Sequence, residues 1–262
     1  MVGEKMKDIN LLTSNGIDVQ KSLELFGDMS VYDETLEEFL NGVNEKLANL
    51  KKYKEASDMA NYAIYAHSLK SDARYLGFTK LAELALEHEM QGKANNVGFI
   101  YDNYDILIEE TNRIINVTSN YLGRTNNQPV EVKKNVIKDE AILVVDDSDL
   151  IINFISKIFN DTFEVVMAHD GKEAIDILTT TLDNKIKGVL LDLNMPGVNG
   201  FEVLDYFKDN NLFAKYPVSI ITGADDRDSI DRAFTYPIID MLQKPFNERD
   251  VKRVVEKTIM YK

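Results

Sequence analysis

The sequence predicts a two-domain protein in which an all-α four-helix bundle precedes an α/β domain built on a doubly wound parallel sheet. Three observations predict this architecture. Residues 20–122 show helical periodicity nearly throughout, short apolar runs alternate with helical segments from residue 141 onward, and the stretch between them shows neither pattern. We therefore expect a helical domain over residues 1–122, a linker over 123–139 and an α/β domain over 140–262.

In the first half, apolar residues recur at helical spacing in four long segments joined by short connections. These segments cover residues 30–52, 57–76, 79–90 and 97–122, and a shorter amphipathic stretch covers 19–26. Gly77 and Gly92 follow the second and third segments, and glycine is favoured just after a helix ends. Because the connections are short, neighbouring helices should pack antiparallel in a bundle.

In the second half, five apolar runs of strand length alternate with five helical segments. The runs are residues 142–145, 163–167, 189–193, 218–221 and 241–242, and the helical segments are 150–160, 172–182, 201–209, 228–234 and 247–260. This alternation is typical of a parallel sheet that helices cover on both faces.

The composition narrows the class of protein. The 262 residues carry a formal net charge of −14, and both predicted domains are acidic. Acidic domains argue against nucleic acid or an anionic membrane as the main partner. There is no cysteine, and no apolar run approaches the roughly 20 residues that a membrane helix needs. We therefore expect a cytoplasmic protein of bacterial type, with no disulfide, secretion signal or membrane segment.

Acidic and polar residues follow the predicted strands, at the edge where a doubly wound sheet binds its ligands. Asp146 and Asp147 follow the first strand, Asp192 follows the third, Thr222 the fourth and Lys244 the fifth. Three clustered carboxylates would repel one another, and a hard divalent cation such as Mg²⁺ removes that cost. Any one of these residues alone is an ordinary loop residue. Together they predict a magnesium-dependent phosphoryl-transfer site with Asp192 as the nucleophile.

These residues lie in four motifs that resemble the response-regulator receiver domain, over residues 140–262. The motifs are Val144-Val145-Asp146-Asp147, Leu191-Asp192-Leu193-Asn194-Met195-Pro196, Ile221-Thr222-Gly223-Ala224 and Gln243-Lys244-Pro245-Phe246. The resemblance implies a flavodoxin-like sheet of order 2-1-3-4-5 and an aspartyl phosphate at Asp192. It also implies that the Asn194 backbone carbonyl is a further Mg²⁺ ligand and that the Lys244–Pro245 peptide is cis.

One rival family and two departures bear on this resemblance. Phosphatases of the haloacid-dehalogenase kind also form an aspartyl phosphate, but they place a second Asp two residues after the nucleophile, where this chain has Asn194. Receivers usually carry an aromatic residue where Met241 stands, and Gly-Ala where this chain has Tyr236-Pro237. We expect both departures to alter the family's usual aromatic route to output and to leave phosphorylation intact.

A polar helix face in the first half carries His67, Lys70, Ser71 and Arg74, opposite the apolar stripe of the 57–76 helix. An exposed imidazole beside cations has the ingredients to hold a phosphoryl group, although helix geometry alone favours an ordinary surface histidine. The other two histidines are interpreted as a solvated helix residue, His88, and a loop residue, His169.

The segment Ala66-His67-Ser68-Leu69-Lys70-Ser71, with Leu76-Gly77 after it, resembles the histidine phosphotransfer domain over residues 16–122. The resemblance implies that His67 is the phosphoryl carrier and that Lys70 is its stabilising cation. Ser71 stands where the family usually has Gly.

Together the two halves predict a phosphorelay protein and not an enzyme in its own right, because no kinase catalytic segment is evident. We expect its partners to be a sensor histidine kinase and other receiver or phosphotransfer proteins. The sequence ends with the last predicted receiver helix, so we expect no DNA-binding output. A different class stays open, in which only Asp192 is phosphorylated and the bundle is a regulated interaction module.

Overall fold

The computed structural model describes residues 7–124, 140–179, 185–223 and 227–261. The chain divides into two compact units, Met1–Lys134 and Asn135–Lys262. The expected linker lies almost entirely outside the described residues, so its bounds and those of the two domains stay predictions. Among the described residues, no helix combines the length and the apolar character needed to cross a membrane.

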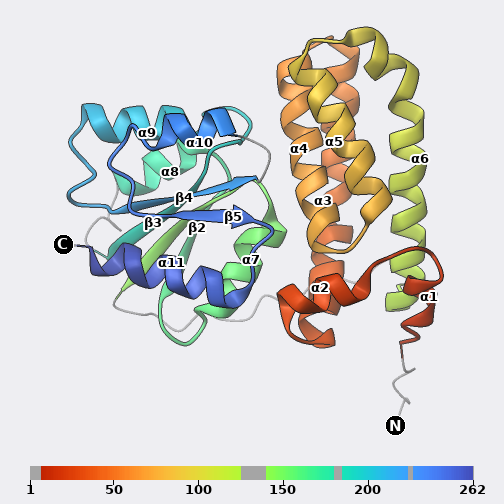
Figure 1. The fold of residues 1–262 in the computed structure, drawn as a ribbon, viewed down its shortest axis with the longest axis horizontal. Helices are drawn as coiled ribbons and strands as arrows, with labels where there is room; N and C mark the ends of the chain where they lie inside the picture. The colour runs from red at the N-terminus through yellow and green to blue at the C-terminus, as the bar shows by residue number, and fades with distance from the viewer. Residues whose placement is uncertain (1–6, 125–139, 180–184, 224–226, 262) are drawn as a thin grey trace. The chain divides into compact units, whose positions relative to one another are not determined.

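The first unit is the expected four-helix bundle, with two short helices at one end (Figure 1). Its helices are α1 (Asn10–Thr13), α2 (Val19–Phe26), α3 (Met29–Glu55), α4 (Met59–Tyr75), α5 (Thr79–Lys93) and α6 (Val97–Leu122). Contacts run from α3 to α4, α4 to α5, α5 to α6 and back from α6 to α3, so the four long helices close around one core. The sequence analysis did not predict α1.

The helix ends follow from local chemistry. Asp28, Asp58 and Asn96 cap the starts of α3, α4 and α6, each accepting a hydrogen bond from a backbone N–H of the first turn. Gly77, at φ +73°, follows the end of α4 as expected. The helix before Gly92 does not end there, because α5 continues to Lys93.

Gly92 instead allows α4 and α5 to approach closely. A Cβ atom built on Gly92 would lie 3.0 Å from the Cβ of Ala63 and 3.2 Å from the carbonyl oxygen of Met59. A larger residue at either position would hold the two helices apart. This close contact determines which side chains of α4 and α5 meet one turn further along.

Gly77 also attaches α2 to the turn between α4 and α5. Its carbonyl accepts a hydrogen bond of 2.9 Å from the backbone N–H of Asp18, and a Cβ on Gly77 would overlap the Asp18 carbonyl. The buried hydroxyl of Tyr32 donates to the carbonyl of Leu76, 3.1 Å away. The start of α2 is therefore held by backbone contacts that only glycine permits at position 77.

The second unit is a five-stranded parallel sheet of order β2-β1-β3-β4-β5, which confirms the expected flavodoxin-like topology. The strands are β1 (Ala141–Val145), β2 (Glu164–Ala168), β3 (Ile186–Asp192), β4 (Val218–Gly223) and β5 (Met241–Lys244). The helices are α7 (Asp149–Ile158), α8 (Gly171–Leu178), α9 (Gly200–Asp209), α10 (Arg227–Ala233) and α11 (Glu248–Met260). The predicted end of α8, at residue 182, lies outside the described residues.

Helices cover both faces of this sheet (Figure 1). The helices α7 and α11 contact each other on one face, and α8 and α9 contact each other on the other face. All five residues of β1 are consequently buried, as a central parallel strand requires. Each fully buried Val, Leu or Ile side chain contributes about 1.5–3 kcal/mol of hydrophobic stabilisation.

Candidate functional site

The strand register brings the predicted acidic residues together at one edge of the sheet. Val145 pairs with Leu191, so Asp146 and Asp192 are the next residues on neighbouring strands. Carboxylate oxygens of Asp146, Asp147 and Asp192 all lie within 4.8 Å of one another. The Lys244 ammonium at the end of β5 lies 2.6 Å from Asp192 Oδ2 and 2.8 Å from Asp146 Oδ2. One cation therefore bridges two of the three carboxylates.

This cluster is deeply buried. The side chains of Asp146 and Asp192 are 0% exposed, and that of Lys244 is 5% exposed. Burial raises the pKa of Asp146 to about 7; Lys244 opposes the shift and the charge of Asp192 adds to it. Burial alone would lower the pKa of Lys244, but the neighbouring carboxylates raise it well above its usual range. The lysine therefore stays charged at neutral pH.

Two loop contacts orient the carboxylates. Oδ1 of Asp146 accepts a hydrogen bond from the backbone N–H of Ser148 at 3.0 Å, and Oδ1 of Asp192 accepts one from that of Asn194 at 3.1 Å. Gly200 begins α9 in contact with the Asp192 backbone, where a Cβ would overlap the Asp192 carbonyl oxygen. These contacts fix both the side chain and the backbone of Asp192, the nucleophile predicted from the sequence.

The predicted hydroxyl lies at the same edge of the sheet. Asp192 pairs with Ile221, so Thr222 is one residue further along β4, and its side chain is buried. The Lys244–Pro245 peptide next to it is cis, as expected.

The donor set fits a magnesium ion. Three carboxyl groups, two of them buried, face one lysine here, and oxygen donors are the ligands that Mg²⁺ prefers. Burial raises the pKa of Asp146, the charges of Asp192 and Asp147 add to that shift, and a divalent cation would offset both effects by favouring the ionised form. Asp146, Asp147 and Asp192 supply side-chain oxygens, and the Asn194 carbonyl stays a predicted further ligand.

In the bundle, His67 is paired with a glutamate that the sequence analysis did not identify. Nδ1 of His67 lies 2.9 Å from Oε1 of Glu89 on α5, and the second carboxylate oxygen of Glu89 accepts a hydrogen bond of 2.6 Å from Lys70. Lys93 lies 2.8 Å from Oε1 of the same carboxylate. Three cationic or proton-donating groups therefore surround one buried carboxylate.

The expectation of an exposed His67 is wrong, because its side chain is 4% exposed. The close approach of α4 and α5 at Ala63 and Gly92 brings Glu89 against the Nδ1 side of the ring. His67 lies ten residues before Gly77 and Glu89 lies twelve residues after it. Counting outward from that turn along two antiparallel helices would have paired them.

Glu89 stays ionised in this position. Burial alone would raise its pKa, but hydrogen bonds and charges from His67 and Lys70 lower the pKa well below its usual range. An ionised carboxylate accepts a hydrogen bond from Nδ1–H and so favours the tautomer with its lone pair on Nε2. Nε2 of His67 has no hydrogen-bond partner among the described residues. In that tautomer Nε2 carries a lone pair that no described residue uses.

The other two histidines differ from each other. The interpretation of His88 as solvated is wrong: it is 1% exposed, its Nδ1 lies 2.7 Å from the hydroxyl of Tyr62, and burial lowers its pKa to about 4. His169 follows β2 in a loop as predicted. Its ring lies between Asp149 and Glu173, and the bond to Asp149 raises its pKa to about 9.

A parallel sheet of this order, with three aspartates and a lysine at its carboxyl edge, defines the second unit as a receiver domain. A helical bundle with a histidine on α4 beside a lysine matches the architecture of a phosphotransfer domain.

Comparisons with known proteins agree with both descriptions. Family models match a "Response regulator receiver domain" at residues 142–256 and an "Hpt domain" at residues 34–113. The chain is 32% identical over 126 residues, 46% of this chain and 81% of the relative, to a protein of Methanothrix harundinacea named "Probable methanogenesis regulatory protein FilR2". It is 28% identical over 120 residues, 45% of this chain and 90% of the relative, to the two-component response regulator ORR3 of Oryza sativa. A solved response regulator receiver domain protein of Clostridium thermocellum is 29% identical, with a TM-score of 0.42, and the match covers 46% of this chain and 94% of that one.

The chain therefore belongs to the response-regulator family and combines a receiver domain with an Hpt domain. It is a two-component phosphorelay protein.

Proposed function

We propose that this protein carries phosphoryl groups between signalling proteins, using Asp192 of the receiver and His67 of the Hpt domain. The observation that carries the proposal is the geometry of Lys244, whose ammonium bridges Asp192 and Asp146 within a cluster of three carboxylates. A buried carboxylate with a cation on one oxygen is poised to accept a phosphoryl group and to hold the product.

At the receiver, an oxygen of Asp192 attacks phosphorus while the bond between phosphorus and the donor atom breaks. Lys244 lies beside the reacting carboxylate and offsets the charge of the transferred oxygens. The Thr222 hydroxyl, one residue beyond the partner of Asp192 in the sheet, is the candidate hydrogen-bond donor to them. Asp146, Asp147, Asp192 and the Asn194 carbonyl would hold Mg²⁺, which would supply positive charge to the phosphoryl oxygens.

At the Hpt domain, the Nε2 lone pair of His67 forms the bond to phosphorus as the donor's bond breaks. The ring then carries a positive charge, which the Glu89 carboxylate offsets through Nδ1–H. Lys70, whose ammonium lies 3.4 Å from Nδ1 of His67, is the candidate cation for the phosphoryl oxygens. When the group leaves for an aspartate, the ring returns to its neutral form without any proton transfer.

The protein acts in this scheme as carrier and acceptor, and its partners supply the phosphoryl group. A sensor histidine kinase and other receiver or phosphotransfer proteins are the partners that such sites require. We place this exchange in the cytoplasm, since that is where histidine kinases use ATP.

The receiver chemistry is tested by intact mass after incubation with acetyl phosphate and Mg²⁺. The wild type should gain one phosphoryl group, and Asp192→Asn or EDTA should prevent the gain. Asp209→Asn, an exposed aspartate at the end of α9, is the matched control and should label normally. Equal labelling of Asp192→Asn and wild type would refute the assignment of Asp192.

The Hpt chemistry is tested separately, with phosphoramidate as a small donor to histidine. The Asp192→Asn chain should gain one phosphoryl group, and the additional change His67→Gln should abolish this gain. A chain that labels on Asp192 but never on His67 would favour the interaction module over the relay.

A further inference from the structure

A pocket of the Hpt domain lies apart from His67, where α2 meets the turn between α4 and α5. Its volume is about 150 Å³, and residues of these three helices and of the turn line it. Arg74, which lines the pocket, follows His67 by seven residues on α4, or roughly 10 Å along the helix. A small molecule in the pocket would therefore not contact the His67 ring, and the pocket is a separate feature of the domain.

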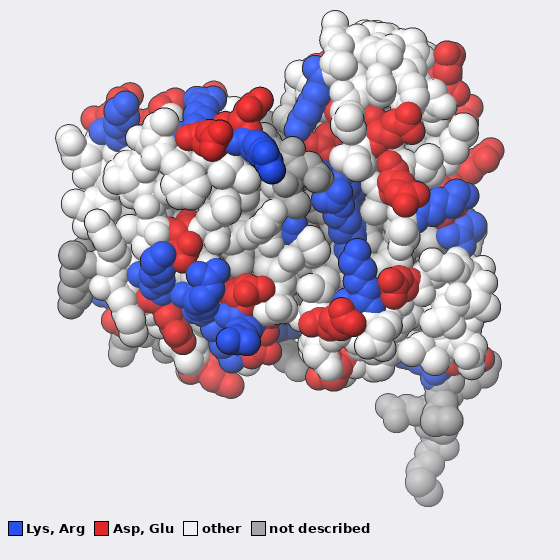
Figure 2. Space-filling model, viewed as in Figure 1, with Lys and Arg blue, Asp and Glu red and all other residues white. Residues whose placement is uncertain are grey.

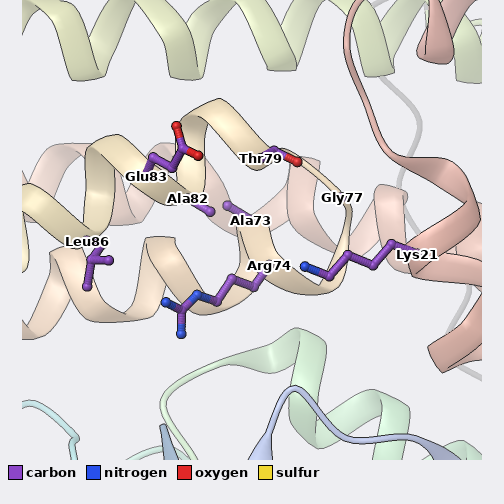
Figure 3. A pocket seen from close by; sticks show the side chains of 8 residues that line it. All are labelled: Lys21, Ala73, Arg74, Gly77, Thr79, Ala82, Glu83 and Leu86. Atoms are coloured by element: carbon purple, nitrogen blue, oxygen red, sulfur yellow. The ribbon is translucent and has the colours of Figure 1, made fainter. Parts of the chain in front are cut away.

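The pocket is hollow because the facing residues of α4 and α5 are small. Ala73 of α4 and Ala82 of α5 are buried and form its floor, and the turn residue Gly77 adds no side chain. Leu86 lies at one end of the pocket, and Lys21 enters from the other end (Figure 3). The volume corresponds to about five water molecules, at roughly 30 Å³ each. This space holds a small molecule with an apolar part and is too small for a nucleotide.

The charges around the pocket favour an anion. In Figure 3 the side chains of Lys21 and Arg74 extend along one side of the pocket, and the carboxylate of Glu83 points to the opposite side. Thr79, the first residue of α5, adds a hydroxyl group, and no side chain caps this helix start. The uncapped start of a helix carries partial positive charge, which adds to the charge of the two cations.

The position of Lys21 is preset by the fold. Lys21 lies on α2, whose start is attached to the turn at Gly77 by the hydrogen bond from Asp18. The Asp18 side chain also caps α2 by accepting a hydrogen bond from the backbone N–H of Lys21 at 3.2 Å. This attachment brings a cation of α2 to the same pocket as the cation of α4 before any ligand arrives, which lowers the entropy cost of binding.

The wider surface does not favour anions. The chain carries a formal net charge of −14, and Figure 2 shows basic and acidic side chains interspersed over the visible face. At physiological ionic strength, exposed charges more than about 8 Å apart are largely screened from each other. Binding of a small anion therefore depends on the cations that line the pocket and not on the charge of the whole chain.

We propose that this Lys21–Arg74 pocket binds a small organic anion, in which a carboxylate or phosphate group carries a short hydrocarbon group. The oxyanion contacts Lys21 and Arg74, because ammonium and guanidinium groups both form charge-assisted hydrogen bonds to such oxygens. The hydrocarbon group lies on Ala73 and Ala82. This binding does not depend on phosphorylation of His67, and it gives the Hpt domain a second, ligand-binding role.

The test follows backbone amide signals of the full-length chain by NMR while small anions are added. Butyrate and butyl phosphate should shift the signals of Gly77, Thr79 and Ala82 in a saturable way. Both should bind about tenfold more tightly than acetate and inorganic phosphate, because their hydrocarbon groups leave water for the apolar floor. Butylammonium, which has the same hydrocarbon group and the opposite charge, should not bind. Tighter binding of butyl phosphate than of butyrate would identify a phosphate ligand, and the reverse order a carboxylate.

Two variants separate the roles of charge and space. Lys21→Gln, at an exposed position of α2, should weaken binding of both butyl anions about fivefold or more, whereas Lys51→Gln, at an exposed position of α3, is the matched control and should bind like the wild type. Ala82→Val keeps both cations but narrows the floor, so it should remove the preference for butyrate over acetate. Urea denaturation shows whether each variant is folded.

Three results would overturn the proposal. One is the absence of saturable shifts at the pocket with every anion. Another is equal binding of butylammonium and butyrate, because the cations would then have no part in recognition. The third is equal dissociation constants for folded Lys21→Gln and Lys51→Gln, which would place the anion elsewhere on the chain.

Discussion

Replacing Glu89 by Gln tests whether the buried carboxylate activates His67. In the structure Glu89 bonds to Nδ1 of His67 at 2.9 Å and to the ammonium groups of Lys70 and Lys93. Glutamine keeps the size of the side chain and an acceptor oxygen but removes the charge. A hydrogen bond to a charged group contributes about 1.5–3 kcal/mol, against about 0.5–1.5 kcal/mol for a neutral one.

The difference of about 1–2 kcal/mol corresponds to roughly a five- to thirtyfold change in rate. The loss of the charge should slow phosphorylation of His67, because the ring gains positive charge only as the bond to phosphorus forms. We therefore expect Glu89→Gln to lower the rate of phosphoramidate labelling of His67 about tenfold. Intact mass at several times measures this rate, with Asp192→Asn as the common background.

Glu87→Gln is the matched control, since Glu87 is an exposed glutamate two residues earlier on α5. Urea denaturation of both variants separates a loss of activation from a loss of folding, because Glu89→Gln also leaves Lys70 short of a counter-charge. If folded Glu89→Gln and Glu87→Gln label at the same rate, the reasoning about Glu89 is refuted.

Three further predictions concern stability and the receiver site. Gly200→Ala should lower the free energy of unfolding by about 1–3 kcal/mol and slow labelling by acetyl phosphate, because the added Cβ would displace the Asp192 backbone. Labelling at the wild-type rate would contradict this prediction. Lys244→Met should lower the free energy of unfolding, measured by urea denaturation without a divalent cation, by about 3–5 kcal/mol, because it leaves the buried carboxylate of Asp146 unpaired. The loss should be smaller with Mg²⁺ present, and a loss that Mg²⁺ does not reduce would argue against the metal site. Between pH 7 and 5 the bundle should lose about 2 kcal/mol of stability through His88, because its folded pKa of about 4 lies below the unfolded value of about 6.5, so the unfolded state binds the proton first. In urea denaturation at several pH values, His88→Phe should remove that dependence, and an unchanged slope would contradict the assignment.

The convergence of Asp146, Asp147, Asp192 and Lys244 at one edge of the sheet could be predicted from the sequence. In a parallel sheet every strand ends at the same edge, so residues that follow different strands meet there once the strands are recognised. Asp146, Asp192 and Lys244 are far apart in sequence, yet their placement needed only the strand pattern and the motif order. The pKa shift of Asp146 and the bridging position of Lys244 required the coordinates, because they depend on burial and on distances of a few ångströms.

The Hpt site was predicted less well, and the reason is the geometry of helix packing. Periodicity shows which face of a helix is apolar, but it does not say which residues of the next helix lie opposite. His67 was identified from its local sequence, whereas Glu89 and the burial of both His67 and His88 were not.

The sequence by itself determined the two fold classes and the convergence of Asp146, Asp147, Asp192 and Lys244 at one edge of the sheet, because these follow from periodicity and from residues that end at a common edge. Only the tertiary structure decided the environment of His67. The small residues Ala63 and Gly92 allow α4 and α5 to approach closely enough for Glu89 to reach Nδ1 of His67. A contact of that kind depends on the separation and rotation of two helices, which no single segment of sequence specifies.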